Sequence, residues 1–161
     1  MAGAHGTQPT PCAIRLCAIR SWTWRSCTPS SAAATGDGRN GHVQSTDGHL
    51  DTDVRTPPEM GGPGGATNPE QLFAAGYAAC FHSALKLVAG KAGADTTDSE
   101  VVADVSIGPN DAGGFGLAVQ LEVSLPQVEP DRARELVEQA HQVCPYSNAT
   151  RGNIEVTLTV A

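Results

Sequence analysis

Positive charge and aromatic side chains are both scarce in this sequence. Its 161 residues contain 10 lysines and arginines against 17 aspartates and glutamates, and only 4% are aromatic. Arg15, Arg20 and Arg25 lie in the first 30 residues, which contain no acidic residue, so the rest of the chain is more acidic than the whole. Because an acidic surface repels phosphate backbones, the composition argues against a nucleic acid partner.

The chain also has no long uninterrupted apolar run and no signal-peptide core, because arginines break the apolar stretches of residues 1–30. We therefore expect a globular protein of one domain that does not bind a membrane. Five cysteines, an odd number in irregular spacing, do not form the framework of a small secreted protein. Three lie in residues 1–30, and Cys80 and Cys144 remain for the body of the chain. This usage predicts a cytoplasmic protein.

Metal and phosphate motifs are missing as well. The histidines at 42, 49, 82 and 141 show no ligand spacing, and His82 points to a different helix face from Cys80. The glycine-rich stretch 61–65 lacks the lysine and the following helix signature of a phosphate-binding loop. We therefore expect neither a metal site nor a nucleotide site.

The pattern of residues 34–161 predicts an α+β domain. Asn68 and Pro69 begin a long buried helix that Gly90 and Gly93 end, and a second helix follows over 128–143, stopped by Pro145. Alternation predicts strands, and Asn40-Gly41 predicts a hairpin turn within residues 36–41. The expected strands are 42–45, 49–55, 101–108, 117–125 and 154–160, in a mixed or antiparallel sheet against the two helices.

Residues 1–33 form an atypical segment, for which we expect disorder or a frameshifted origin. A transit peptide is possible because the segment is basic, but nothing specific supports it. Read in another frame, one set of codons for Cys27 to Ser31 encodes Tyr-Thr-Val-Val, a good strand sequence. We therefore hypothesise that a frameshift has replaced a native first strand. Detection of a native peptide that contains Trp22 and Trp24 would refute this hypothesis.

Cys80 and Cys144 are the residues with chemical potential. A reactive thiol on a helix with a second thiol elsewhere is the minimum for a two-cysteine redox cycle. The nucleophile must be a thiolate, which burial disfavours and a nearby guanidinium favours. Glu70 is ten residues before Cys80, too far to touch it but placed to anchor an arginine between them. Each residue also has an ordinary role open to it: core packing for the cysteines, a surface charge for Glu70.

Two segments of the chain resemble the organic hydroperoxide resistance (Ohr) branch of the Ohr/OsmC-like thiol peroxidases. They are Thr67 to Phe81, TNPEQLFAAGYAACF, and Val143 to Asn153, VCPYSNATRGN. The second is typical of Ohr rather than of its OsmC sister group, and the whole resemblance runs from about Ala34 to the C-terminus.

The resemblance implies a role for each of four residues. Cys80 corresponds to the peroxidatic cysteine, Cys144 to the resolving cysteine, Arg39 to the catalytic arginine and Glu70 to the carboxylate that holds it. Leu72, Phe73 and Phe81 are candidates to bind the alkyl tail, although core packing suits them equally.

The family further implies an OsmC-like fold in an intertwined homodimer, with no metal, haem or flavin. Its substrates are alkyl and fatty-acid hydroperoxides, and its reductant is a lipoylated protein or another dithiol. Two alternatives stay open: an OsmC-type paralogue with other preferences, and a non-enzymatic protein whose cysteines oxidise without turnover. One departure from the family is that residues 1–33 do not match its first strand.

Overall fold

The computed structural model describes residues 16–19, 22–25 and 30–161, with side chains from residue 30 onward. The chain divides into two compact units, Met1–Thr52 and Asp53–Ala161, which are described separately. Much of the atypical segment lies outside the described residues, at 1–15, 20–21 and 26–29. The predicted boundary at residue 33 and the frameshift hypothesis therefore stay predictions.

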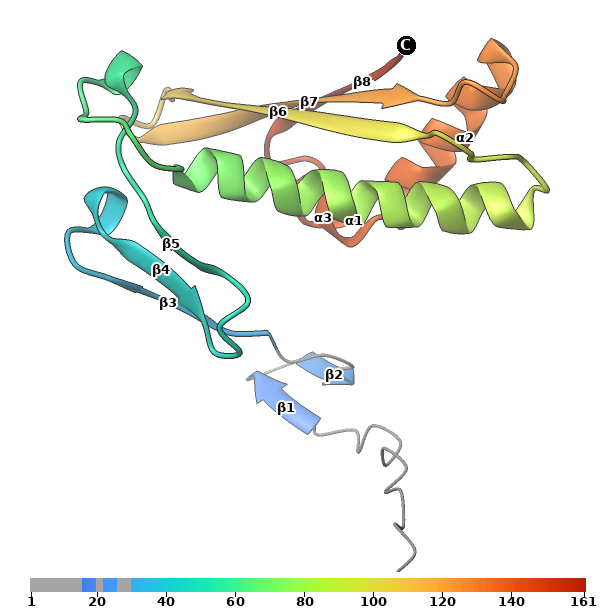
Figure 1. Ribbon diagram of the computed structural model, residues 1–161. Helices are drawn as coiled ribbons and strands as arrows, with labels where there is room; N and C mark the ends of the chain where they lie inside the picture. The colour runs from blue at the N-terminus through green and yellow to red at the C-terminus, as the bar shows by residue number, and fades with distance from the viewer. Residues whose placement is uncertain (1–15, 20–21, 26–29) are drawn as a thin grey trace, which may run out of the picture. The chain divides into compact units, whose positions relative to one another are not determined.

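The first unit consists of short antiparallel strands (Figure 1). Strand β1 (Leu16–Ile19) pairs with β2 (Trp22–Arg25), and β3 (Ala32–Thr35) pairs with β4 (His42–Ser45). The β3–β4 hairpin encloses the predicted turn at 36–41, which contains the 3₁₀ helix η1 (Gly38–Asn40). Neither β1–β2 nor β3 was predicted from the sequence. A strand therefore does precede the Gly38-Arg39 turn.

Strand β5 (Asp51–Asp53) completes the β3-β4-β5 sheet and is shorter than the predicted strand 49–55. The predicted start of this strand is wrong because His49 belongs to the preceding turn. The Asp47 carboxylate accepts a hydrogen bond from the His49 backbone N–H at 3.1 Å, and the Ser45 hydroxyl donates to it at 2.5 Å. These bonds to Asp47 favour a turn over a continuous ladder.

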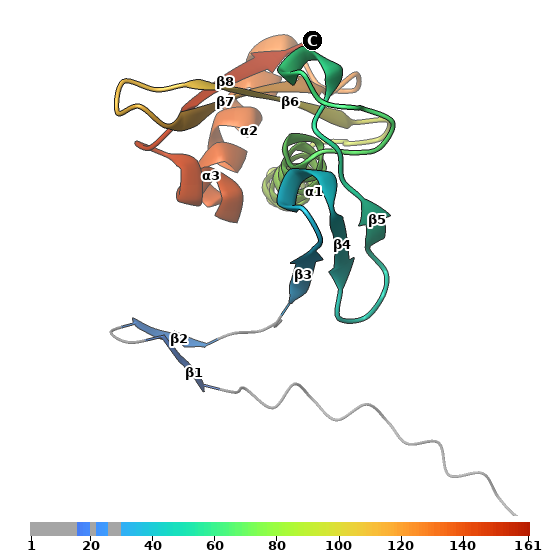
Figure 2. The same cartoon turned by 90° about the vertical axis from the view of Figure 1, so that its left-hand side faces the viewer.

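The second unit packs helices against one face of a mixed sheet (Figure 2). Its elements are, in chain order, η2 (Pro58–Met60), α1 (Pro69–Lys91), β6 (Glu100–Pro109), β7 (Phe115–Ser124), α2 (Pro130–Val143), α3 (Pro145–Thr150) and β8 (Glu155–Val160). Strand β7 runs antiparallel to β6 and parallel to β8. A parallel pair needs a crossover connection, which α2 and α3 supply. The predicted α+β class and mixed sheet are confirmed.

The core of this unit lies between the sheet and the helices. Alternate residues of β7, namely Val119, Leu121 and Val123, are buried, and Leu121 pairs with Ala103 of β6 and Leu158 of β8. Helix α2 buries a single stripe with helical spacing that consists of Ala133, Leu136, Val137 and Ala140. Helix α1 contacts β6, α2 and α3, so it forms the centre of the unit.

Helix α1 is apolar around most of its circumference. By length and composition alone Pro69–Lys91 could cross a membrane, contrary to the statement from the sequence that no segment is long enough. Tyr77, Phe81 and Leu85 are nevertheless fully buried against the rest of the unit, as in the core helix of a globular domain. Other positions, including Ala75, Ala79, Ser83 and Leu87, are exposed within the described chain.

Three of the four predicted helix ends are confirmed. Asn68 caps α1 by accepting a hydrogen bond from the Gln71 backbone N–H at 2.9 Å, and Pro69 is the first helical residue. The helix ends at Lys91, and Gly93 follows with φ of +66°, a conformation that glycine adopts without strain. Helix α2 ends where predicted, at Val143, but begins at Pro130 rather than at residue 128, because Glu129 is not helical and proline suits the first helical position. The short helix α3, directly after it, was not predicted.

Candidate active site

Cys80 lies in the middle of α1, and its side chain is only partly buried. Three and four residues away on the same helix, Tyr77 and Ala84 are buried in the core. Cys80 therefore lies at the margin of the buried face, packed against the core but only partly buried.

Cys144 lies at the break between two helices and is fully buried. Its backbone is extended, with φ of −65° and ψ of +124°, which is what the ring of the following Pro145 requires. Its N–H still bonds to the Ala140 carbonyl at 2.9 Å, while its carbonyl accepts from the Asn148 N–H at 3.0 Å. Cys144 thus belongs to both helices, and the break between them fixes the direction of its side chain.

The two sulfur atoms are neighbours. Cys144 Sγ lies 3.7 Å from Cys80 Sγ, although 64 residues separate them in sequence, and both cysteines are free. A disulfide needs about 2.05 Å between its sulfur atoms, so the two sulfur atoms must approach by less than about 2 Å. The fold brings together the two thiols that the sequence singled out.

The surroundings of Cys80 disfavour its thiolate. Burial raises the pKa of the Cys80 thiol, and the neighbouring Cys144 raises it further, while a hydrogen bond from the Tyr146 backbone lowers it. The net pKa lies above the ordinary cysteine value. Within this environment most of the thiol is protonated at neutral pH, so an efficient nucleophile here requires an added cation.

A buried group of hydroxyls joins α1 to the segment that contains Cys144. The Tyr77 hydroxyl donates to Ser147 Oγ at 3.0 Å and lies 3.1 Å from Thr150 Oγ1. The Thr150 hydroxyl in turn donates to the Tyr146 carbonyl at 2.9 Å. Tyr77 and Ser147 are completely buried and Thr150 almost so.

Aromatic rings extend this contact toward the surface. Phe73 and Tyr146 stack with ring centres 6.1 Å apart, and Tyr77 lies 5.9 Å from Phe73 and 5.7 Å from Tyr146. Gly76 leaves room for the Tyr146 ring, because a Cβ at position 76 would lie 3.2 Å from its hydroxyl oxygen. Glycine at position 76 therefore lets the Tyr146 ring lie against α1 without a crowded contact.

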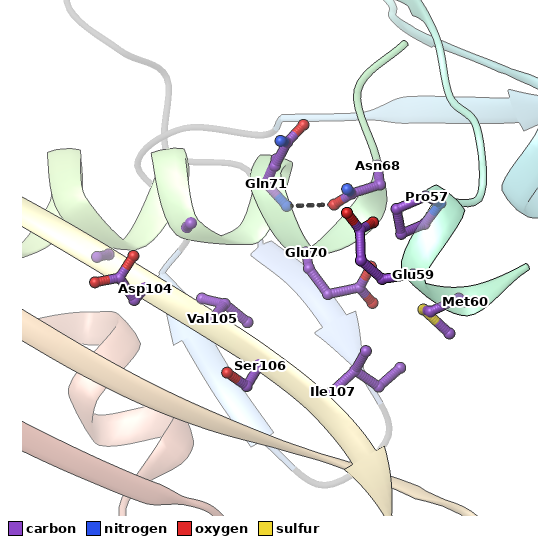
Figure 3. A pocket seen from close by; sticks show the side chains of 12 residues that line it. Pro57, Glu59, Met60, Asn68, Glu70, Gln71, Asp104, Val105, Ser106 and Ile107 are labelled. Carbon is purple, nitrogen blue, oxygen red and sulfur yellow. Dashed lines mark hydrogen bonds between the residues drawn. The ribbon is translucent and has the colours of Figure 1, made fainter. Parts of the chain in front are cut away.

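Glu70 lines a cavity of about 530 Å³ at the start of α1. Figure 3 shows Glu70 in the first turn of the helix, with Glu59 and Met60 of η2 on one side and Ser106 and Ile107 of β6 below. The lining is partly acidic and includes neither cysteine. Ten helical residues correspond to about 15 Å, so Glu70 acts on Cys80 only through another group.

The other predicted site residues lie in different surroundings. Arg39 is in η1 and belongs to the first unit, whereas Cys80 belongs to the second. Leu72 is partly buried, Phe73 packs against the core and Tyr146, and Phe81 is fully buried. None of these three apolar residues lines the cavity at Glu70. Their predicted role in binding the alkyl tail stays a prediction.

The histidine beside Cys80 makes a different contact. His82 Nε2 lies 2.9 Å from Ser99 Oγ, and burial lowers the pKa of His82. Among residues 30–161, no group of three or more histidine, cysteine or acidic side chains lies close enough to hold a metal ion.

Sequence reasoning missed Tyr77, Ser147 and Thr150. One signal was present: Tyr77 is a large polar-tipped residue among alanines and glycines, one turn before Cys80. Ser147 and Thr150 follow Cys144 by three and six residues, a helical spacing that places both hydroxyls on one face. Because no helix was predicted after Pro145, that spacing was not recognised.

Comparisons with known proteins agree with this geometry. The family model described as OsmC-like protein matches residues 62–159. The organic hydroperoxide resistance protein of Xanthomonas axonopodis pv. citri (strain 306) is 54% identical over 132 residues, covering 81% of this chain and 92% of that protein. Protein OhrB of Bacillus subtilis (strain 168) is 48% identical over 122 residues, covering 75% and 89%.

A crystal structure of an organic hydroperoxide resistance protein from Elizabethkingia anophelis, with thiocyanate bound, superimposes with a TM-score of 0.81. It is 53% identical and covers 86% of this chain and 99% of that one. Identity near one half over most of both chains exceeds what a shared fold alone requires. The chain belongs to the Ohr subfamily of the OsmC-like proteins.

Proposed function

We propose that this protein is a cysteine-based peroxidase that reduces organic hydroperoxides to alcohols, with Cys80 as nucleophile and Cys144 as resolving thiol. The observation that carries the assignment is the 3.7 Å separation of the two sulfur atoms at the junction of α1 and α3. Membership of the Ohr subfamily supports the substrate class.

The reaction needs two thiols and no further redox group. The Cys80 thiolate attacks the outer oxygen of the hydroperoxide, the O–O bond breaks, and the alkoxide leaves as an alcohol after taking a proton. Cys80 is then a sulfenic acid. The Cys144 thiol attacks its sulfur, releases water and forms the disulfide, so that two electrons have passed from the thiols to the peroxide.

Arg39 and Glu70 complete the proposed mechanism. Because burial raises the pKa of Cys80, the first step needs a cation to stabilise the thiolate, and a guanidinium also binds peroxide oxygens. We assign this role to Arg39 and the holding of its guanidinium to Glu70. The supporting observations are the family match and the position of Glu70 in a partly acidic cavity at the start of α1. Leu72 and Phe73 are our candidates to contact the alkyl tail.

The test is consumption of linoleic hydroperoxide by the full chain with dihydrolipoamide as reductant. Wild-type protein is expected to turn over, and Cys80→Ser to be inactive. Without reductant, Cys144→Ser is expected to consume about two equivalents of hydroperoxide, because its sulfenic acid has no internal partner and the second equivalent converts it to the sulfinic acid. Oxidation of wild-type cysteines without turnover would instead support a non-enzymatic redox protein.

We further propose that the working form is a homodimer. Helix α1 exposes Ala75, Ala79, Ser83 and Leu87 at a four-residue spacing within the described chain. Leu87, 55% exposed, is the largest apolar side chain on this face. Small residues allow close approach of another helix, and a second copy of this face is the occupant that matches it in shape.

Sedimentation velocity tests the dimer. Leu87→Glu is expected to give monomers, since it places a charge in the proposed interface without disturbing the core of its own subunit. Phe115→Glu introduces the same side chain at another exposed apolar residue, on β7 rather than on α1, and is expected to leave the dimer intact. Monomeric wild-type protein at micromolar concentration would refute the proposal.

We propose a lipoylated protein as the reductant and the cytoplasm as the compartment. The cycle begins with both thiols reduced, and Cys80 and Cys144 are free in the structure. A reducing compartment keeps them so between cycles. In hydroperoxide-treated Cys144→Ser, a dihydrolipoyl thiol can attack the Cys80 sulfenic acid, which releases water and forms a mixed disulfide. Trapping of this mixed disulfide with lipoylated proteins tests the reductant, and cell fractionation tests the compartment.

A further inference from the structure

The mechanism above leaves the buried hydroxyl group of Tyr77 without a role. Tyr77 lies three residues before Cys80 on α1, and its hydroxyl bonds to Ser147 and Thr150 of α3. The same segment supplies two interactions with the Cys80 thiol, from Cys144 Sγ and from the Tyr146 backbone.

We propose that Tyr77 is a positioning residue that holds the Cys144–Thr150 segment in reach of Cys80, so that disulfide formation outpaces further oxidation. This inference rests on the proposed function for its biological consequence but not for its geometry.

The Tyr77 hydroxyl is buried, and its hydrogen bonds are made to the segment that contains Cys144. The side chain has no exposed surface, and its oxygen bonds within the described chain to two side chains of α3. A phenylalanine would fill the same space in the core. The hydroxyl therefore adds a polar link between the helix of one cysteine and the segment of the other, and a buried hydroxyl without a partner is unfavourable.

The sulfur separation explains why such a link affects chemistry. The resolving step closes the gap from 3.7 Å to about 2.05 Å, and its rate depends on how often the two sulfur atoms are in range. A segment fixed at Tyr77 keeps Cys144 in range continuously. A loosened segment spends part of its time with Cys144 out of reach, although every reacting group is still present.

The competing reaction gives the link a measurable outcome. Cys80 sulfenic acid can react with a second hydroperoxide, taking up one oxygen to become a sulfinic acid and releasing a second alcohol. The alternative is condensation with the Cys144 thiol, which releases water. The ratio of sulfinic acid to disulfide therefore reports the rate of the resolving step at a given hydroperoxide concentration.

The main test compares Tyr77→Phe with Ser99→Ala. Both substitutions remove a hydroxyl that ties α1 to another segment, but Ser99 bonds to His82 and not to the Cys144 segment. Mass spectrometry after treatment with linoleic hydroperoxide is expected to show about a tenfold higher ratio of sulfinic acid to disulfide in Tyr77→Phe, the effect of one lost buried bond. Ser99→Ala is expected to show the wild-type ratio. The initial rate of Cys80 oxidation is expected to equal that of wild type in both variants.

A second measurement avoids peroxide altogether. Equilibration with reduced and oxidised glutathione gives the effective concentration of Cys144 relative to Cys80, which should fall about tenfold in Tyr77→Phe. Ser147→Ala, which removes a partner at the other end of the link, should lower it as well.

The two arms separate the two proposals. Failure of wild-type protein to react with hydroperoxide would overturn the proposed function alone, since the glutathione equilibrium still tests positioning. Unchanged values in both arms for folded Tyr77→Phe, or equal losses in Ser99→Ala, would overturn the positioning role of Tyr77.

Discussion

Gly76 offers a direct measure of how tightly α3 packs on α1. Alanine at position 76 gains about 1 kcal/mol from helix propensity relative to glycine. Its Cβ would lie 3.2 Å from the Tyr146 hydroxyl oxygen and 3.3 Å from Cε2, closer than the ordinary contact of about 3.5–4.0 Å. Two opposed effects of similar size therefore meet at one position.

The environment of Tyr146 decides between them. Its side chain is 39% exposed, so the ring can move outward by the few tenths of an ångström that the new methyl group requires. We expect the steric contact to cancel about half of the gain in propensity, leaving Gly76→Ala more stable than wild type by about 0.5 kcal/mol.

Gly90→Ala is the matched control on the same helix. A Cβ at position 90 meets no atom within 4 Å, so this variant keeps its gain in propensity, up to about 1 kcal/mol. Urea unfolding of both variants gives the difference, which measures the contact with Tyr146. Equal stabilisation by the two substitutions would refute the reasoning, because the close approach would then have no energetic effect. A loss above about 2 kcal/mol in Gly76→Ala would refute the mobility of the ring.

Two further predictions concern reactivity and the core. Arg39→Ala should move the midpoint of Cys80 alkylation by iodoacetamide above the ordinary cysteine value, measured against pH in a Cys144→Ser background. Burial then acts without the proposed cation, less thiolate is present at any pH, and the rate rises only as pH passes the raised pKa; a midpoint near pH 6 would contradict this. Leu136→Ala should lower the free energy of unfolding by about 2–5 kcal/mol, because Leu136 is fully buried between α2 and the sheet. Thermal unfolding of this variant checks the value, and a loss below about 1 kcal/mol would contradict the burial.

Local signals predicted most of the second unit correctly. The cap at Asn68, the proline after it and the glycines at 90 and 93 bound α1 because they act on the backbone within one turn. Strands β6, β7 and β8 were recognised because one face of each is more buried than the other, so apolar and polar residues alternate along the sequence.

Helix α3 and strand β3 were missed because their local sequence carries no distinct signal. Pro145 was interpreted as the end of a helix, which is correct for α2, but the same proline is also the first residue of α3. Proline supports both roles, since it disfavours a helical residue before it and suits the first helical position. Strand β3 was missed because its four alanine and threonine residues are all exposed, so backbone pairing with β4 leaves no hydrophobic pattern.

The candidate site was predictable in part. Resemblance assigned a role to Cys80 and Cys144, but no local rule gives a distance between residues 64 positions apart. The link from Tyr77 to Ser147 spans 70 residues and depends on the unpredicted helix α3. Long-range contacts between side chains arise from packing, which a single sequence does not display.

Helix α1 combines these observations into an argument about assembly. A helix that is apolar around most of its circumference is expected to be covered over most of it, whether in a membrane or in a large core. One side of α1 is covered by β6, α2 and α3, and that side includes Tyr77, Phe81 and Leu85. The opposite side, with Ala79 and Leu87, has no cover within the described chain. A second copy of the same helix would cover it and would explain why a core helix has the composition of a membrane span. Since Cys80 lies at the margin of the two sides, the proposed dimer would also limit the access of water to the reactive sulfur.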